Sequence, residues 1–208
     1  MLSSDKRVFF SSCVFDILDN VYEPAEDSFL FAESLTIREY DVVLDVGTGC
    51  GILGVIAAKK ASKVLVTDIN PYAVRCAKDN ARLNGVLNKL SFLQCDLFSA
   101  IRSEERFDVI LFNAPYLPSK RVDDDSWLGR AWSGGAKGRW LIDRFIREVP
   151  KYLKQDGCVF LMQSNLSGLD MTLQRFEESG LKANVIGKRD LPFFETIFLV
   201  KAEYTRLI

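Results

Sequence analysis

A glycine-rich turn and the acidic residues near it are the first features of the 208-residue sequence that could bind a ligand. The segment 45–51 reads Asp-Val-Gly-Thr-Gly-Cys-Gly and ends an apolar run that is typical of a buried strand. Glycines at such a position let the backbone approach a ligand closely and turn into a helix N-terminus. Asp68 ends the next apolar run, where a carboxylate can accept hydrogen bonds from both hydroxyls of a ribose. Together these features predict a site for an adenosine-containing cofactor.

Two classes of cofactor fit this turn. The residues from Gly49 to Gly54 match the dinucleotide fingerprint Gly-x-Gly-x-x-Gly, which favours a nicotinamide cofactor and a dehydrogenase. That fingerprint begins where the strand ends, however, and Gly47 already occupies this position. Asp45 would be unfavourable beside a pyrophosphate and favourable beside a cationic methionine group. The turn therefore favours the methionine-containing cofactor, and leaves open a dehydrogenase or a non-catalytic module that binds a nucleotide.

A second candidate segment, Asn113-Ala-Pro-Tyr116, follows the apolar strand pattern 107–112. In isolation, asparagine and proline at a strand end indicate a turn. On a strand beside the cofactor strand, the side-chain oxygen of Asn113 and a neighbouring carbonyl can accept both N–H groups of a planar amide or amino group. Tyr116 can stack on the same planar group. Such an arrangement needs no general base before attack, in agreement with a sequence that contains no histidine.

Strand patterns alternate with helical patterns along the chain. The strand patterns are 41–45, 63–68, 90–94, 107–112 and 158–162, and the helical patterns are 52–60, 71–83, 141–153 and 169–179. This alternation predicts a mostly parallel, doubly wound α/β sheet with helices on both faces. Too few residues join the closing strands 182–186 and 195–201 for a crossover helix, so we expect one of them to run antiparallel. We expect a leading helix at 26–35 and a short strand or hairpin before Tyr22.

The length of the chain, and a sequence with no internal repeat, low-complexity tract or Pro/Ser-rich linker, favour a single domain over residues 1–208. The 27 basic and 28 acidic side chains give a net charge of −1, which argues against a nucleic-acid partner. No stretch approaches the ~18 apolar residues of a membrane span, so we expect a cytoplasmic protein with no membrane partner. The five cysteines include no Cys-x-x-Cys pair, and with no histidine in the chain we expect no metal site.

Four segments together resemble one family. The turn 45–51 looks like the cofactor loop of the seven-strand class of S-adenosylmethionine-dependent methyltransferases. The segment 113–116 resembles the Asn-Pro-Pro-Tyr motif of enzymes that methylate planar amide or amino nitrogens, with Ala114 in place of the first proline. The segments 21–29 and 131–139 resemble signatures of the HemK-type glutamine methyltransferases. The match is to the short archaeal and eukaryotic branch, which lacks the bacterial N-terminal helical domain.

The resemblance implies a class I, Rossmann-like methyltransferase fold with an antiparallel C-terminal strand. It implies methyl transfer from S-adenosylmethionine to the side-chain amide of a glutamine, in the Gly-Gly-Gln loop of a class-one translation release factor. It also admits protein lysine methylation. An adenine-N6 methyltransferase remains an alternative, because adenine presents the same planar NH₂ group, but such an enzyme should carry a basic face or a target-recognition domain. A dehydrogenase would leave the segment from Asn113 to Tyr116 without a role.

Roles follow from the resemblance, residue by residue. The methionine end of the cofactor would contact the glycine turn, at Asp45, Gly47, Gly49 and Gly51. Asp68 would contact the ribose, and Asp96 and Leu97 would contact the adenine. Ser28, on the leading helix, would also contact the cofactor. Asn113, Pro115 and Tyr116 would be the catalytic segment, Asn113 would also contact the cofactor, and Ala114 and Trp132 would join that segment in binding the substrate. For residues 26–28, the alternative is a plain helix N-terminus, where acids are favoured.

The third strand pattern, Leu90–Gln94, is expected at an edge of the sheet, because the chain crosses to the other half after it. Residues 90–95 carry no charge to blunt that edge. A partner could therefore add a strand there, and the family resemblance suggests a small zinc-binding activator subunit. The alternative is that the helix 71–83 and nearby loops cover this edge.

Overall fold

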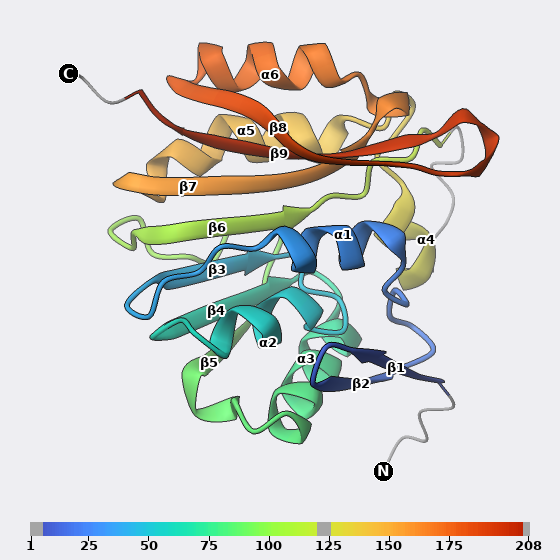
Figure 1. The fold of residues 1–208 in the computed structure, drawn as a ribbon, viewed down its shortest axis with the longest axis vertical. Coiled ribbons are helices and arrows are strands. Elements are labelled where there is room, and N and C mark those ends of the chain that lie inside the picture. Colours follow the sequence, from blue (N-terminus) through green and yellow to red (C-terminus); the bar gives the residue numbers. More distant parts are fainter. Residues whose placement is uncertain (1–5, 120–125, 206–208) are drawn as a thin grey trace.

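The computed structural model describes residues 6–119 and 126–205, and its centre is a seven-stranded sheet (Figure 1). The strand order is β5-β4-β3-β6-β7-β9-β8. The last strand of the chain runs antiparallel to both of its neighbours, and the remaining pairs are parallel, as the short closing connection predicts. The strands are β3 (Val42–Val46), β4 (Lys63–Asp68), β5 (Leu90–Gln94), β6 (Phe107–Asn113), β7 (Leu153–Ser164), β8 (Leu181–Asp190) and β9 (Thr196–Tyr204).

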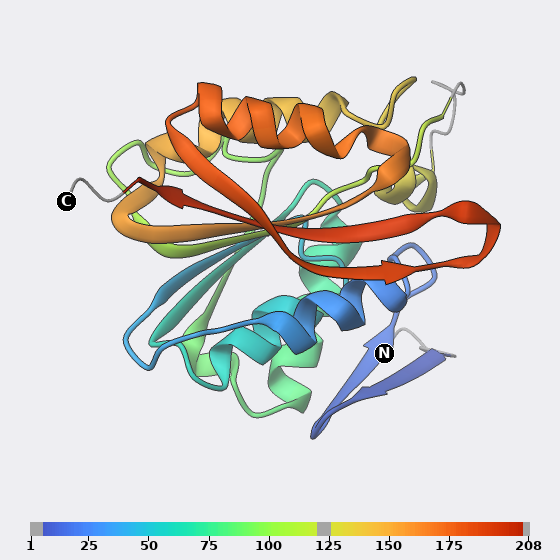
Figure 2. The ribbon, with the colours of Figure 1, turned by 45° about the horizontal axis from the view of Figure 1, so that its top comes forward.

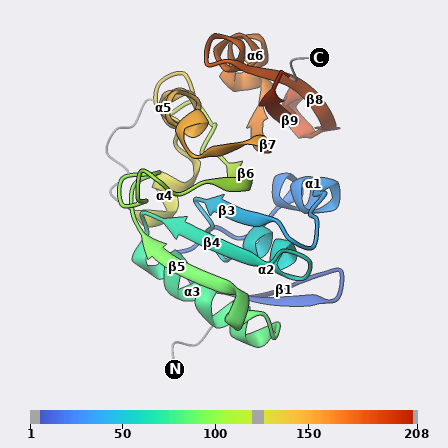
Figure 3. The same ribbon diagram turned by 90° about the vertical axis from the view of Figure 1, so that its left-hand side faces the viewer.

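Helices cover both faces of the sheet (Figure 3). Successive residues of a strand point to opposite faces, so Val43 belongs to one apolar cluster and Leu44 to the other. The first cluster packs against α1 (Glu26–Ser34), α2 (Ile52–Ala58) and α3 (Pro71–Leu83). The second packs against α5 (Trp140–Glu148) and α6 (Leu169–Glu178), and a short helix, α4 (Trp127–Trp132), lies beyond the strand ends. The expected fold class is confirmed.

The segment before Tyr22 is a hairpin of β1 (Lys6–Phe10) and β2 (Cys13–Ile17), which pair in antiparallel register. Two asparagines, one within α3 and one at its C-cap, hold it to the rest of the fold. Asn80 donates to the Asp16 carbonyl and accepts from the Asp16 N–H, at 2.9 Å in each case. Asn84 makes the same pair of hydrogen bonds to Val14. These side chains satisfy backbone groups of β2 that have no strand partner on that side.

Several element boundaries differ from the sequence-based expectation. The helix expected over 141–153 ends at Glu148, because Pro150 cannot donate to the helical ladder, and residues 149–151 form a 3₁₀ turn. β7 begins at Leu153, five residues before the expected start, and bulges before Cys158. Gly157 permits this path, since a Cβ there would lie 2.9 Å from the Asp108 carbonyl oxygen. α4 was not expected at all.

β5 is an edge strand, as expected. It pairs with β4 on one side, and no strand of residues 6–119 or 126–205 pairs with its other side. Phe92 and Leu93 are half-buried, and Ser91 and Gln94 are exposed. α3 packs against both β4 and β5, and Figure 3 shows it beside these two strands. Across the same described ranges, no helix has the length and hydropathy of a membrane-spanning segment.

Candidate functional site

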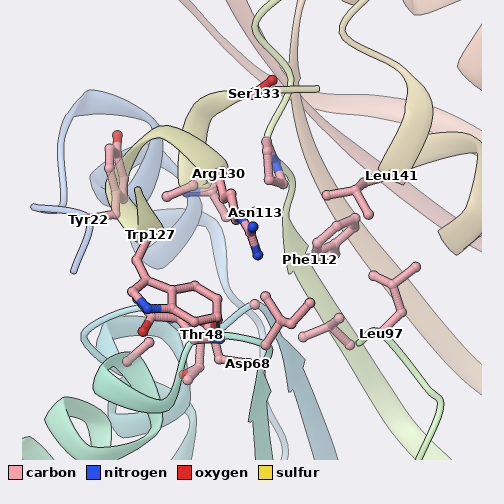
Figure 4. A pocket seen from close by; sticks show the side chains of 18 of the residues that line it. Tyr22, Thr48, Asp68, Leu97, Phe112, Asn113, Trp127, Arg130, Ser133 and Leu141 are labelled. Carbon is pink, nitrogen blue, oxygen red and sulfur yellow. Dashed lines mark hydrogen bonds between the residues drawn. The ribbon is translucent and has the colours of Figure 1, made fainter. Parts of the chain in front are cut away.

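A cavity of about 560 Å³ opens where β3, β4, β5 and β6 end (Figure 4). This volume lies in the range of ~300–1,000 Å³ that is usual for small-molecule sites. β3 has β4 on one side and β6 on the other, so the chain crosses over at this point of the sheet, where doubly wound folds bind ligands. In Figure 4, Asn113 lies between Trp127 and Leu141. The cavity therefore joins the two segments that the sequence singled out.

The glycine turn after β3 adopts backbone angles that suit glycine. Gly47, Gly49 and Gly51 have φ values of +66°, +57° and +88°. Gly51 caps α2, and a Cβ there would lie 2.9 Å from the Ala77 Cα, so this glycine allows α2 to pack closely on α3. Around Gly49, in contrast, nothing lies within 4 Å of the position a Cβ would take. That space is available to a ligand.

Asp68 joins the turn after β3 to the loop after β4. One of its carboxylate oxygens accepts from the Gly49 N–H at 2.9 Å, and the other accepts from the Asn70 N–H at 2.9 Å. Burial raises the pKa of Asp68, and these backbone hydrogen bonds act in the opposite direction. Asp68 lines the cavity, and each carboxylate oxygen keeps a further lone pair, so the carboxylate can accept hydroxyl donors as well.

Asp45 lies beneath the turn and does not line the cavity. It is 1% exposed, and its Oδ2 accepts from the Thr48 hydroxyl at 2.6 Å and from the Gly54 N–H at 3.0 Å. Its Oδ1 is buried and has no hydrogen-bond partner in the described part of the chain. Burial raises the pKa of Asp45 to about 7. A cation above the turn would favour the ionised form of this carboxyl.

Asn113 points its two amide atoms in different directions. Its Nδ2 donates to Asp27 Oδ2 at 3.2 Å and to Ser28 Oγ at 3.3 Å, both on α1. Its Oδ1 is buried and has no partner within residues 6–119 and 126–205, and the residue lines the cavity. An unpaired buried acceptor costs about 1–3 kcal/mol unless a ligand supplies a donor. Asn113 is therefore ready to receive an N–H group.

Asp27 is a site residue that sequence reasoning did not select. It is 6% exposed, and Oδ1 accepts from the Tyr22 hydroxyl at 3.0 Å and from the Ser28 N–H at 2.6 Å. Oδ2 accepts from the Tyr116 hydroxyl at 3.1 Å in addition to the Asn113 amide. Burial and this negative charge raise the pKa of both tyrosines, which therefore remain hydrogen-bond donors. Only the match of segment 21–29 to a family signature pointed to this residue.

A second loop supports the segment 113–116 from behind. The Leu117 N–H donates to the Trp132 carbonyl at 3.1 Å, and the Gly134 N–H donates to the Leu117 carbonyl at 3.0 Å. Gly138 has a φ of +66°, and a Cβ there would collide with the Tyr116 carbonyl oxygen. The signature segment 131–139 is thus a buttress for the segment that carries Asn113.

Trp132 ends α4 and does not line the cavity. It is 47% exposed, and its ring meets that of Tyr22 edge to face at 6.4 Å between centroids. At the far end of the cavity, Asp96 accepts from Arg144 at 2.8 Å, and the Arg144 guanidinium lies 4.9 Å over the Trp140 ring. Leu97 has a φ of +48°, in a region that side chains rarely adopt and that is often found at ligand sites.

The expected site residues fall into two groups. One group lines the cavity: Ser28, Gly47, Gly49, Asp68, Asp96, Leu97, Asn113 and Pro115. The other group surrounds the cavity without lining it: Asp45, Gly51, Ala114, Tyr116 and Trp132. The lining also includes Tyr22 and, from α4, Trp127 and Arg130, none of which the sequence reasoning selected. No cluster of metal-binding side chains occurs in the described ranges.

Comparisons with known proteins agree with this geometry. The sequence model of the methyltransferase small domain family matches residues 23–128. A Methanocaldococcus jannaschii protein named as a protein N5-glutamine methyltransferase is 44% identical over 86% of this chain and 90% of its own length. The human methyltransferase HEMK2 is 31% identical over 78% of this chain and 80% of its length. The Schizosaccharomyces pombe eRF1 methyltransferase catalytic subunit mtq2 is 25% identical over 82% of this chain and 84% of its own length.

The fold also matches a solved structure, described as the E. cuniculi Mtq2-Trm112 complex responsible for methylation of the eRF1 translation termination factor. The matched chain has a TM-score of 0.69 and 29% identity, over 89% of this chain and 99% of that one. The family match includes the glycine turn after β3, Asp68 and Asn113, so it covers the core of the cavity. The chain belongs to the methyltransferase small domain family and, within it, to the HemK-type protein methyltransferases.

Proposed function

We propose that the protein transfers a methyl group from S-adenosylmethionine to the side-chain amide nitrogen of a glutamine in a protein. The observation that carries this proposal is the Asn113 amide. Its Nδ2 is held by Asp27 and Ser28, its buried Oδ1 has no partner in the described residues, and the residue lines the cavity. A glutamine amide offers the N–H donor that this oxygen lacks, and two acceptors are needed to fix both of its N–H groups. The carbonyl of Ala114 would be the second.

The residues around the cavity fit S-adenosylmethionine. The open space at Gly49 would admit the methionine end, and the negative charge of Asp45 below would favour its sulfonium. Asp68 would accept from the ribose hydroxyls, and Asp96 and Leu97 would contact the adenine. When bound, S-adenosylmethionine supplies an electrophilic methyl group. The carboxylates and the glycine turn supply position and charge for it.

The chain contributes orientation rather than proton transfer. An amide nitrogen is a poor nucleophile because its lone pair is delocalised into the carbonyl. Asn113 and the Ala114 carbonyl would hold both N–H groups and direct the nitrogen toward the methyl group, in line with the bond that breaks. Tyr116 would cover the planar amide, with its hydroxyl fixed on Asp27. The extra proton can leave the nitrogen after transfer, so no histidine is required.

We further propose that the substrate is the Gly-Gly-Gln loop of a class-one translation release factor. Relatives named for release factor or eRF1 methylation support this choice. A loop with two glycines suits a cavity lined by Tyr22 and by residues of α4, since small residues let a backbone approach closely. Lysine and adenine-N6 methylation are tested alongside in the experiment below.

A partner is proposed at the free edge of β5. The E. cuniculi structure is described as a complex with Trm112, and edge strands with exposed backbone groups are sites for strand addition. The half-buried Phe92 and Leu93 would then be covered by a small activator subunit. That this subunit binds zinc is an expectation from the family resemblance.

The experiment is methyl transfer from labelled S-adenosylmethionine to three substrates: the release factor, the same factor with its loop glutamine replaced by alanine, and DNA. We expect label only in the first, and mass spectrometry should place it on the glutamine. Label that persists after the glutamine is replaced would indicate lysine, and label in DNA would indicate adenine. Either result would contradict the proposed methylation of a glutamine.

The matched variant is Asn113→Ala. It should lower the rate of transfer on the order of 10²-fold or more, because it removes an orienting acceptor from a desolvated site. The dissociation constant of S-adenosylmethionine, measured by calorimetry, should change little. Asn184→Ala, at an exposed position on β8, is the control and should leave both quantities unchanged. Wild-type activity in Asn113→Ala would contradict the role of this residue.

A further inference from the structure

The tip of the β8–β9 hairpin, residues Leu191–Glu195, exposes two adjacent aromatic rings. Phe193 is 97% exposed and Phe194 is 98% exposed, the largest exposures among the large apolar side chains of the described residues. Both residues have a φ of +62°. This left-handed conformation is rare for bulky residues and persists only where the surrounding structure imposes it. A solvent-exposed, strained aromatic pair contributes nothing to the folded core.

Hydrogen bonds hold the tip in this conformation. The Leu191 N–H donates to the Glu195 carbonyl at 2.8 Å and closes the turn. Asn165, just after β7, donates from Nδ2 to the Phe194 carbonyl at 3.2 Å and accepts on Oδ1 from the Thr196 N–H at 3.0 Å. The neighbouring side chain of Leu166 is 51% exposed and extends the apolar surface. The fold therefore presents the two rings in a defined position.

The tip lies at the same end of the sheet as the active site (Figure 2). Asn113 pairs with Met162 in the sheet, and Asn165, which holds the tip, comes three residues later. Glu195 connects the two regions more directly: its charge contributes to the raised pKa of both Tyr22 and Tyr116. Its Oε1 is buried and unpaired in the described part of the chain. The aromatic tip thus lies at the end of the sheet where the cavity opens, beside residues that surround the cavity.

We propose that Phe193 and Phe194 form a docking surface for the protein substrate, and that they contact an apolar hollow in its body next to the methylated loop. This inference rests on the proposed function. The cavity of about 560 Å³ has the size of a small-molecule site, so most of a protein substrate must lie over the surface around it. Exposed aromatic side chains beside such a site are typical anchors of protein interfaces. The substrate, rather than a second copy or a lipid surface, is the partner that the active site brings to this position.

The test compares a protein substrate with a peptide. The variant is Phe193→Asn with Phe194→Asn, because asparagine tolerates the left-handed conformation and the change removes only the rings. Tyr40→Asn is the control, since Tyr40 is 82% exposed and precedes β3 at the opposite end of the sheet. For intact release factor, we expect KM to rise on the order of 10-fold in the double variant. For a short Gly-Gly-Gln peptide and for S-adenosylmethionine binding, we expect no change.

Several outcomes would overturn the docking surface. One is an unchanged KM of the double variant for intact release factor. Another is an equal rise in KM for intact release factor and for the peptide. The wild type could instead dimerise or bind lipid vesicles. If the double variant abolished that binding and left KM unchanged, the tip would be assigned to a second copy or to a lipid surface. Failure of the wild type to methylate release factor at all is a separate result, and it would contradict the proposed function itself.

Discussion

The carboxylate of Asp27 holds four other side chains of the site in one arrangement: those of Tyr22, Ser28, Asn113 and Tyr116. It contacts the amide that would receive the substrate, yet it does not line the cavity. Its role would be to keep Asn113 from rotating its Nδ2 toward the substrate. Asp27 is therefore a positioning residue.

We predict that Asp27→Ala lowers kcat by about 10- to 100-fold, since a small misplacement of a substrate-orienting group has effects of this size. The dissociation constant of S-adenosylmethionine should stay close to the wild-type value. Steady-state kinetics and calorimetry measure the two quantities. Glu26→Ala, which removes an exposed acid that pairs with Arg189, is the control. An equal loss of cofactor affinity and kcat would point to a general collapse of α1 instead.

Asp45 should make stability depend on pH. Burial raises its pKa to about 7 in the folded protein, against 3.8 for the free side chain. Between these values the folded state keeps a proton that the unfolded chain has released, so the free energy of unfolding falls as pH rises through this window. Asp45→Asn cannot ionise and still offers an acceptor to Thr48. The variant should gain stability relative to the wild type between pH 4 and 7, by at most on the order of 4 kcal/mol.

Urea unfolding of both proteins across this pH range, without cofactor, measures the difference. Asp156→Asn, at an exposed position, controls for the loss of a charge and should show no such trend. A stability difference between Asp45→Asn and the wild type that does not vary with pH would mean that Asp45 titrates normally.

Sequence reasoning found the residues whose type and position carry a direct chemical meaning. Asp68 ends β4 and Asn113 ends β6, the two parallel strands on either side of β3, so both residues lie at the same end of the sheet, and both line the cavity. Asp27 was not selected, because its importance comes from donors that lie up to 89 residues away in the chain. An acid near a helix N-terminus has an ordinary explanation, and nothing local distinguishes this one.

At the scale of elements, the loop 131–139 is the main support of the segment 113–116. Gly138→Ala should destabilise the protein by about 3 kcal/mol, through the left-handed backbone and the collision with the Tyr116 carbonyl. It should also lower methyl transfer by displacing Tyr116. Gly85→Ala is the matched control: its φ is +70°, but no atom lies within 4 Å of the added Cβ, so it should cost about 1 kcal/mol and leave transfer intact. If Gly138→Ala and Gly85→Ala had equal effects on stability and on methyl transfer, the loop 131–139 would not be the support of the segment 113–116.

Strands were easier to predict than the loops between them. β3, β4, β5 and β6 were expected within one residue at each end, because buried parallel strands are short continuous apolar runs. α4 has only six residues and none of them is buried, so it carries no apolar periodicity to detect. The early start of β7 depends on the contact of Gly157 with the backbone of β6, which no local pattern encodes.

At the scale of the whole molecule, the free edge of β5 is where a second protein can continue the sheet. We predict that Phe92→Glu abolishes co-purification with a co-expressed small activator subunit while the variant remains soluble. The reason is that a charge would be buried under an added strand. Phe9→Glu, on the exposed face of β1, is the control and should not affect the complex. If Phe92→Glu still co-purified with the activator subunit to the same extent, the subunit would have to bind at another surface.

One further consequence follows from Asn80. Besides its bonds to β2, its Nδ2 donates at 2.8 Å to the carbonyl of Cys50, inside the glycine turn. No residue of the hairpin 6–17 lines the cavity, yet this one buried amide makes the hairpin and the turn parts of a single cooperative unit. Binding energy gained at the turn is then shared with the hairpin by thermodynamic linkage. A ligand that never contacts the first β-hairpin would still slow the opening of its strands and the exchange of its amide protons with solvent.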